Sequence, residues 1–315
     1  MYFYYWYYFV NPEKGEKVAS FDRSFRRAPV VHSYHYNRKE GCGVNSYWMR
    51  CTYSSSNGFV RYGVSGSGPP LVLIHGTPWS SFNWRHIIPG LSEFFTVYYY
   101  DLLGYGKSEK PEGDVSLGVQ HDLFKALLNE WQLEEPIVIG HDFGGTTALR
   151  THLLHGVPYK KLVLIDPVAI GPWGSPFFTH VNQYEAAFRG LPDAMHEALV
   201  STYVQGAMYQ PMPEDTRRGI LHPWLGSTGR PAFYRQIAQA RQRYTDEIEP
   251  LYASIRMPTL ILWGREDEWI PVEKGRALHS RIPGASFCII PDAGHLVQED
   301  QPAVLLGKLL PFLLA

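Results

Sequence analysis

Three side chains able to carry out nucleophilic chemistry follow predicted strands in this sequence. The apolar run IVI at 137–139 is followed by the letters GHDFGG, in which Asp142 is the third residue. Glycines on both sides of one polar residue are typical of a sharp turn from a strand into a helix, which exposes that residue at the edge of a sheet. Asp267 follows a strand predicted at 259–263, and His295 follows one predicted at 286–290. The carboxyl ends of parallel strands meet at one edge of a sheet, so we expect these three side chains to lie together.

An aspartate at such a turn narrows the chemistry. A carboxylate with an ordinary pKa of about 3.9 is ionised at neutral pH and can attack without a base. Attack on a carbonyl would give an anhydride, whereas attack on a saturated carbon bearing a leaving group gives a stable ester of Asp142. His295, oriented by Asp267 through its other ring nitrogen, would activate water to hydrolyse that ester. The backbone N–H groups of Thr77 and Phe143 would form the oxyanion hole.

The elements that must position these residues follow an alternating pattern. Strands are predicted at 58–64 (an edge strand), 71–74, 95–100, 137–141, 161–165, 259–263 and 286–290. Helices are predicted at 81–91, 115–131, 146–155, 194–204, 232–243, 272–280 and 303–314. This order predicts an α/β fold with a mostly parallel sheet flanked by helices. Residues 49–167 and 249–315 would form the core, residues 168–248 a helical cap, and residues 1–48 a poorly ordered N-terminal extension.

The combined pattern resembles the α/β-hydrolase superfamily over roughly residues 58–315. The letters HGTP at 75–78, the turn around Asp142, Asp267 and His295 stand in the chain order that this fold uses. An aspartate at the nucleophile position resembles epoxide hydrolases and haloalkane dehalogenases, in which this turn commonly reads GHDWG. The resemblance therefore implies a hydrolase that acts through an aspartyl ester. Asp166, after the strand at 161–165, is an alternative position for the acid.

The leaving group separates the two families. The resemblance implies that a dehalogenase would hold its halide with a tryptophan directly after the nucleophile, but Phe143 has no N–H in its side chain. Thr77 replaces the asparagine found in many dehalogenases. Trp79, Trp173 and Trp224 are other candidates for a halide contact, and together with Phe143 they indicate an apolar pocket for an uncharged substrate.

An epoxide instead needs a proton donor, which that family supplies from cap tyrosines. The letters FYRQ at 233–236 resemble the WYRN segment that carries one of these tyrosines, so Tyr234 is the first candidate and Tyr184 the second. We therefore expect an epoxide hydrolase, with haloalkane dehalogenation as the alternative. A carboxylesterase that uses a serine elsewhere, or a non-catalytic member of the superfamily, are further alternatives.

Composition limits the partners. The chain has 315 residues and a net charge of −1, which offers no electrostatic reason to bind nucleic acid or an anionic membrane. Its three cysteines form no CxxC motif or Cys/His cluster, so neither a metal site nor a cofactor is expected. Sparse cysteines favour a reducing compartment, and we expect a cytoplasmic enzyme that binds only a small apolar substrate and water. The aromatic run at 1–10 is too short to span a bilayer.

Overall fold

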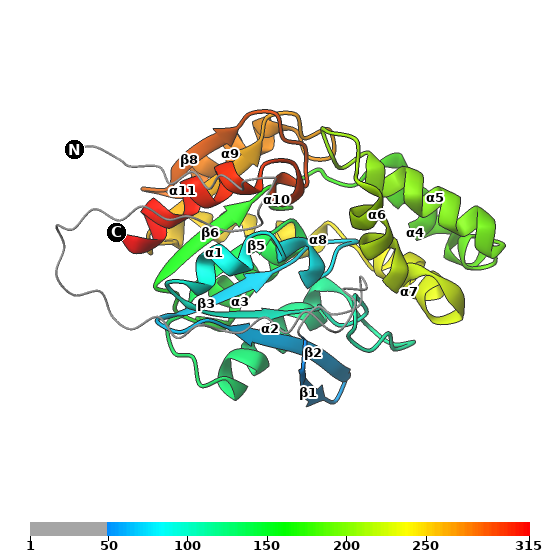
Figure 1. Ribbon diagram of the computed structural model, residues 1–315, viewed down its shortest axis with the longest axis horizontal. Helices are drawn as coiled ribbons and strands as arrows, with labels where there is room; N and C mark the ends of the chain where they lie inside the picture. Colours follow the sequence, from blue (N-terminus) through cyan, green and yellow to red (C-terminus); the bar gives the residue numbers. More distant parts are fainter. Residues whose placement is uncertain (1–48) are drawn as a thin grey trace, which may run out of the picture. The chain divides into compact units, whose positions relative to one another are not determined.

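One sheet organises the computed structural model, which describes residues 49–315 (Figure 1). The strands are β1 (Cys51–Ser55), β2 (Gly58–Ser65), β3 (Pro70–Ile74), β4 (Thr96–Tyr100), β5 (Ile137–His141), β6 (Lys161–Ile165), β7 (Thr259–Gly264) and β8 (Ser286–Ile290). They lie in the order β1-β2-β4-β3-β5-β6-β7-β8. β2 pairs antiparallel with β1 and β4, and all other neighbours are parallel. The predicted α/β-hydrolase fold class is confirmed.

Helices lie on both faces of this sheet. The α-helices are α1 (Ile88–Ser92), α2 (Leu117–Glu130), α3 (Phe143–His155), α4 (Pro176–Arg189), α5 (Asp193–Gln205), α6 (Glu214–Leu221), α7 (Gly226–Ala238), α8 (Arg243–Asp246), α9 (Val272–Arg281), α10 (Val297–Asp300) and α11 (Pro302–Leu314). Three short 3₁₀ helices are η1 (Ser81–Trp84), η2 (His222–Trp224) and η3 (Glu249–Ser254).

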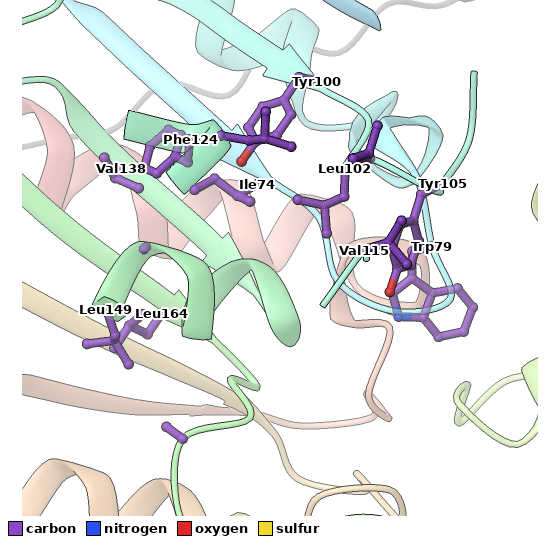
Figure 2. Packing of buried hydrophobic residues seen from close by; sticks show 14 of the residues in the cluster. Ile74, Trp79, Tyr100, Leu102, Tyr105, Val115, Phe124, Val138, Leu149 and Leu164 are labelled. Atoms are coloured by element: carbon purple, nitrogen blue, oxygen red, sulfur yellow. The ribbon is translucent and has the colours of Figure 1, made fainter. Parts of the chain in front are cut away.

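The apolar side chains divide between the two faces because successive residues of a strand point to opposite sides. In β3, Val72 and Ile74 pack in the cluster that contains Phe124 of α2 and Leu149 of α3 (Figure 2). Their neighbours Leu71 and Leu73 pack in the other cluster, with side chains of α1 and α11. The central strands β3, β5, β6 and β7 are buried on both faces, as the continuous apolar runs predict.

Two predictions near the amino-terminal side of the sheet were wrong. The strand predicted at 58–64 is not an edge strand, because β1 pairs with it through Cys51–Ser55. The helix predicted at 81–91 is divided into η1 and α1. Pro89 lies in the first turn of α1, where its missing N–H is tolerated. It cannot donate to the carbonyl oxygen of Arg85, so a continuous helix over 81–91 would lack a hydrogen bond at this point.

The segment between β6 and β7 contains helices and no strand, and we call α4 to α8 with η2 and η3 the inserted helices. The helix predicted at 232–243 begins earlier and ends at Ala238, and α4 and α6 were not predicted. Residues 49–315 belong to one compact unit, so the core and cap boundaries at 167/168 and 248/249 stay predictions. The predicted extension at 1–48 lies outside the described residues. No helix among residues 49–315 is long and apolar enough to cross a membrane.

Candidate active site

The turn between β5 and α3 holds Asp142 in a strained conformation. Its φ is 51° and its ψ is −119°, a region that residues other than glycine rarely adopt. Such strain costs of order 1–3 kcal/mol and persists only where the surroundings enforce it. Gly144 allows the turn to approach β3 closely, since a Cβ atom added there would lie 2.1 Å from the carbonyl oxygen of Ile74. The turn therefore presents the Asp142 side chain at the carboxyl edge of the sheet.

Backbone donors face the Asp142 carboxylate. The N–H of Thr77 donates to Asp142 Oδ1 at 2.6 Å. Phe143 is the first residue of α3, so its N–H has no partner four residues earlier within the helix. Both residues line the cavity above Asp142. The predicted oxyanion hole therefore has one donor already bonded to the nucleophile, and the assignment of Phe143 as the second stays a prediction.

His295 links Asp142 to Asp267. Its Nε2 lies 3.3 Å from Asp142 Oδ2, and its Nδ1 lies 2.8 Å from Asp267 Oδ2. The other oxygen of Asp267 accepts hydrogen bonds from the N–H groups of Trp269 and Ile270, each at 2.8 Å. Asp142, Asp267 and His295 are only 3%, 6% and 0% exposed. The structure thus brings the three predicted residues into one buried chain of contacts.

The two carboxylates control the charge of His295. Burial lowers the pKa of its imidazole, but the charges of Asp267 and Asp142 and their hydrogen bonds more than offset burial, so the pKa is raised well above its ordinary value. The two carboxylates therefore favour the imidazolium form of His295. Any reaction that neutralises Asp142 removes part of this stabilisation and lowers the pKa of His295.

Asp166, the alternative acid, lies behind Asp267 and does not contact the His295 ring by a hydrogen bond. Its Oδ1 accepts from the N–H of Gly264 at 2.8 Å, and the side chain is fully buried. Burial and the neighbouring charge of Asp267 raise the pKa of Asp166 well above its ordinary value. Burial and the charge of Asp267 therefore favour the protonated form of Asp166, which can donate a hydrogen bond to Asp267, the carboxylate bonded to His295.

This assignment predicts different effects for two substitutions. Asp166→Asn should change the free energy of unfolding by less than about 1 kcal/mol, because an amide can donate to Asp267 and accept from Gly264. Asp166→Leu should cost about 1–3 kcal/mol, since both partners lose a buried hydrogen bond. Urea unfolding at pH 7 measures both values. An asparagine variant as unstable as the leucine variant would mean that Asp166 carries a charge in the folded protein.

An apolar cavity of about 170 Å³ opens above Asp142. Aromatic and aliphatic side chains form most of its wall, and Glu268 and Lys274 add charges. The lining residues are Thr77, Asp142, Phe143, Val168, Pro172, Trp173, Gly174, Ser175, Phe178, Tyr203, Glu268, Trp269, Ile270, Pro271 and Lys274. Such a wall fits a small, mainly apolar ligand.

The predicted tryptophans have different places. Trp173 lines the cavity, and its Nε1 donates to Thr245 Oγ1 at 2.8 Å. Trp224 does not line the cavity, and its Nε1 donates to the carbonyl oxygen of Pro78 at 2.7 Å. Trp79 is also buried outside the lining, stacked on Trp269 with 5.4 Å between ring centroids. The prediction of three pocket tryptophans is therefore corrected to one of them, Trp173, because the other two pack between elements.

Neither predicted tyrosine reaches the cavity. The Tyr234 hydroxyl lies 2.9 Å from His196 Nδ1, and His196 Nε2 lies 2.9 Å from the carbonyl oxygen of Trp224. A carbonyl only accepts, so Nε2 carries the proton and Tyr234 donates to Nδ1. Tyr184 lies on α4 with 51% of its surface exposed. The structure therefore corrects both candidates for a proton donor.

Tyr203, on α5, is the tyrosine that lines the cavity, and sequence reasoning missed it. Its ring stacks on Trp269 with 4.5 Å between centroids. The hydroxyl makes no hydrogen bond with any residue from 49 to 315, and burial together with the charges of Asp142 and Tyr105 raises its pKa well above the ordinary value. Tyr203 thus offers the cavity a protonated hydroxyl. Nothing in the surrounding letters distinguishes it from the other tyrosines.

One group of potential metal ligands occurs within residues 49–315, away from this cavity. His121, Asp122 and His155 have ligand atoms within 4.8 Å of one another. The His155 Nε2 is already 2.7 Å from Asp122 Oδ1, and the two imidazole rings stack at an interplanar angle of 21°. The lone pairs of two stacked rings lie in separate, nearly parallel planes and do not converge on one ion, so this arrangement is not prepared for a metal ion.

Comparison with known proteins agrees with this fold. Residues 69–302 match the family described as alpha/beta hydrolase fold, and the chain belongs to this family. The crystal structure of an alpha/beta hydrolase fold protein from Burkholderia ambifaria is 49% identical, with a TM-score of 0.82, and the match covers 84% of this chain and 97% of that one.

Two curated relatives represent different reactions. The 2-hydroxymuconate semialdehyde hydrolase of a Pseudomonas species is 29% identical over 262 residues, which cover 76% of this chain and 84% of the relative. Haloalkane dehalogenase 2 of Mycobacterium bovis is 27% identical over 269 residues, which cover 79% and 90%. Membership of the family therefore identifies the chain as a hydrolase of this fold. The reaction has to be inferred from the site residues of this chain.

Proposed function

We propose that this protein hydrolyses a small apolar epoxide through a covalent ester of Asp142. The observation that carries the proposal is the setting of the Asp142 carboxylate, with the Thr77 N–H on Oδ1 and His295 beside Oδ2. A carboxylate held in this way can become an ester whose carbonyl oxygen is already bonded to a donor that its hydrolysis requires. A serine hydrolase would need a hydroxyl in that position.

In the first step, Asp142 Oδ2 attacks an epoxide carbon and the ring C–O bond breaks. The ring oxygen takes the electron pair and accepts the proton of the Tyr203 hydroxyl, which leaves a hydroxyalkyl ester and a tyrosinate. A phenol is ordinarily a stronger acid than the alcohol that forms, and the charge of Asp142, which helps to raise the pKa of Tyr203, is lost in the same step, so this transfer is favourable. Asp142 loses its negative charge in this step.

In the second step, the ester is hydrolysed. Because the charge of Asp142 is gone, the pKa of His295 falls, and its proton returns to the Tyr203 tyrosinate. Neutral His295 then takes a proton from water, and the hydroxide adds to the Asp142 carbonyl carbon while the Thr77 N–H stabilises the oxyanion. Collapse of the tetrahedral intermediate breaks the ester C–O bond. The departing alkoxide takes the acid proton of Asp142, which releases a diol and restores both the carboxylate and the imidazolium.

The hydrogen-bond donors of the cavity favour an epoxide over a halide. A halide needs N–H donors, but the indole N–H groups of Trp173 and Trp224 are bonded to Thr245 and Pro78. Phe143 provides no N–H from its side chain. The Tyr203 hydroxyl, by contrast, has no partner among residues 49–315 and can donate to an oxygen atom.

Haloalkane dehalogenation is the second candidate. The likeness to Haloalkane dehalogenase 2 favours it, as does the indole of Trp269, which lines the cavity beside His295. The same Asp142 ester would form in either reaction, so the two candidates differ only in the group that leaves. Halide release from 1-bromobutane tests the alternative directly.

A single turnover in H₂¹⁸O tests the ester. With enzyme in excess over styrene oxide, the first diol should contain only ¹⁶O, because its new oxygen comes from Asp142 while the label enters the carboxylate. Mass spectrometry of the diol and of the peptide that contains Asp142 measures both positions. A diol that carries ¹⁸O in the first turnover would mean that water attacks the epoxide directly, and unchanged styrene oxide would remove the epoxide substrate.

A further inference from the structure

We propose that Gln236 is a positioning residue that fixes the oxyanion loop, defined as Gly76–Pro78, from the inserted helices. The inference rests on the proposed function, because the Thr77 N–H of this loop is the donor that stabilises the ester carbonyl. Gln236 lies on α7 and is 2% exposed. It does not line the cavity and so acts through the loop and not on the substrate.

The contacts of Gln236 converge on one atom. Its Oε1 accepts a hydrogen bond from Thr77 Oγ1 at 2.6 Å and a second from the Tyr105 hydroxyl at 2.9 Å. The Thr77 residue therefore donates twice in different directions: its hydroxyl to Gln236 and its backbone N–H to Asp142 Oδ1 at 2.6 Å. Fixing the side chain fixes the direction of the N–H, since both belong to one residue.

The surroundings of the Gln236 amide nitrogen indicate that Oε1 serves to position Thr77 and not to stabilise the fold. Nε2 is buried and makes no hydrogen bond with any residue from 49 to 315. A buried donor without a partner costs free energy, and an apolar side chain of similar volume would avoid that cost. The free energy gained from the two hydrogen bonds to Oε1 is therefore offset in part by the cost of burying Nε2 without a partner.

A second inserted element holds the same loop. Trp224 of η2 donates from Nε1 to the carbonyl oxygen of Pro78 at 2.7 Å, and its ring lies 5.5 Å from that of Tyr105, edge to face. The loop is therefore attached to the inserted helices at two consecutive residues, Thr77 through its side chain and Pro78 through its backbone. A displacement of α7 or η2 relative to the sheet would move the oxyanion donor.

Gln239 provides a matched control on the same helix end. Its Oε1 accepts from the N–H of Val115 at 2.7 Å, and its Nε2 donates to the carbonyl oxygen of Gly113 at 3.2 Å. It thus connects α7 to the rest of the chain through another loop. Gln236→Met and Gln239→Met remove the same chemical group from one helix, but only the first removes a bond to the oxyanion loop.

Hydrogen–deuterium exchange of the free enzyme tests the inference without any substrate. We expect faster exchange in the peptide that covers residues 75–79 for Gln236→Met than for the wild type or Gln239→Met. Thr77→Val cuts the same hydrogen bond from the other side and should accelerate exchange similarly, which keeps the test valid if the methionine variant folds poorly. Unchanged exchange in both variants, or an equal change in Gln239→Met, would overturn the inference.

Kinetics on styrene oxide then give the functional result. Gln236→Met and Thr77→Val should each lower kcat about tenfold with KM nearly unchanged, because a misdirected donor affects the chemical step. The double variant should be no slower than the singles, since both act through one hydrogen bond. Additive losses, or a loss shared by Gln239→Met, would contradict the role. If exchange responds as expected while no epoxide is turned over, the proposed function fails and the attachment of the loop stands.

Discussion

His295→Gln is expected to stop the reaction at the ester and to leave a covalent adduct on Asp142. The mass of the protein should increase by the mass of one epoxide molecule, and a digest should locate the increase on the peptide that contains Asp142. Release of the diol should slow by about 10²–10⁴-fold, the contribution of a general base. Intact-protein mass spectrometry after incubation with styrene oxide measures the adduct.

The geometry of the site explains why the first step should survive this substitution. Attack needs only the Asp142 carboxylate and a proton donor, and Tyr203, which also lines the cavity, supplies the proton. Glutamine can still donate to Asp267, which otherwise would lose its partner. It has no nitrogen that can accept a proton at neutral pH, so water is not activated.

The double variant Asp142→Asn with His295→Gln is the control. A carboxamide does not attack the epoxide, so no adduct should form while the Thr77 N–H keeps an oxygen acceptor. An adduct on another residue, or an adduct that persists in the double variant, would contradict the role of Asp142. A mixture of styrene oxide and 1-bromobutane would also identify the preferred leaving group, because the two adducts differ in mass.

The positions of Asp142, Asp267 and His295 were predictable because they depend on the sheet. Parallel strands have recognisable apolar runs, and each functional residue follows such a run at its carboxyl end, where the fold brings the loops together. The glycines near Asp142 also predicted a sharp turn at this position, and the structure has such a turn, with a φ of 51° at Asp142. The sequence therefore predicts that these residues lie together from their places after strands, and their roles from the resemblance to the superfamily.

The residues of the inserted helices were not predictable in the same way. Which side chains of a helix face the cavity depends on how the helix is rotated about its own axis. The letters around Tyr234 did not reveal that rotation, nor that α7 begins at Gly226. Tyr234 consequently points to His196, and Tyr203, on a different helix, faces the cavity. The separation of η1 from α1 and the partner strand β1 were missed for a related reason, since short elements depend more on tertiary contacts than on local preference.

Tyr203→Phe is expected to slow the opening of styrene oxide by about 10²-fold or more while leaving the ester chemistry of a bromoalkane nearly unchanged. Phenylalanine keeps the ring and its stacking on Trp269 but removes the proton that the leaving alkoxide requires. A bromide leaves as a stable anion and needs no proton. Single-turnover rates with both substrates measure the difference.

Tyr234→Phe is the matched control, since it also removes one buried hydroxyl from the inserted helices. Its hydroxyl donates to His196, so this variant should lose about 1 kcal/mol of stability but react within a factor of about three of the wild type. If Tyr234→Phe slowed epoxide opening as much as Tyr203→Phe, the proton would come from Tyr234 after a rearrangement of α7. If Tyr203→Phe slowed both substrates equally, Tyr203 would shape the cavity without acting as the acid, and the preference for epoxides would lose its chemical basis.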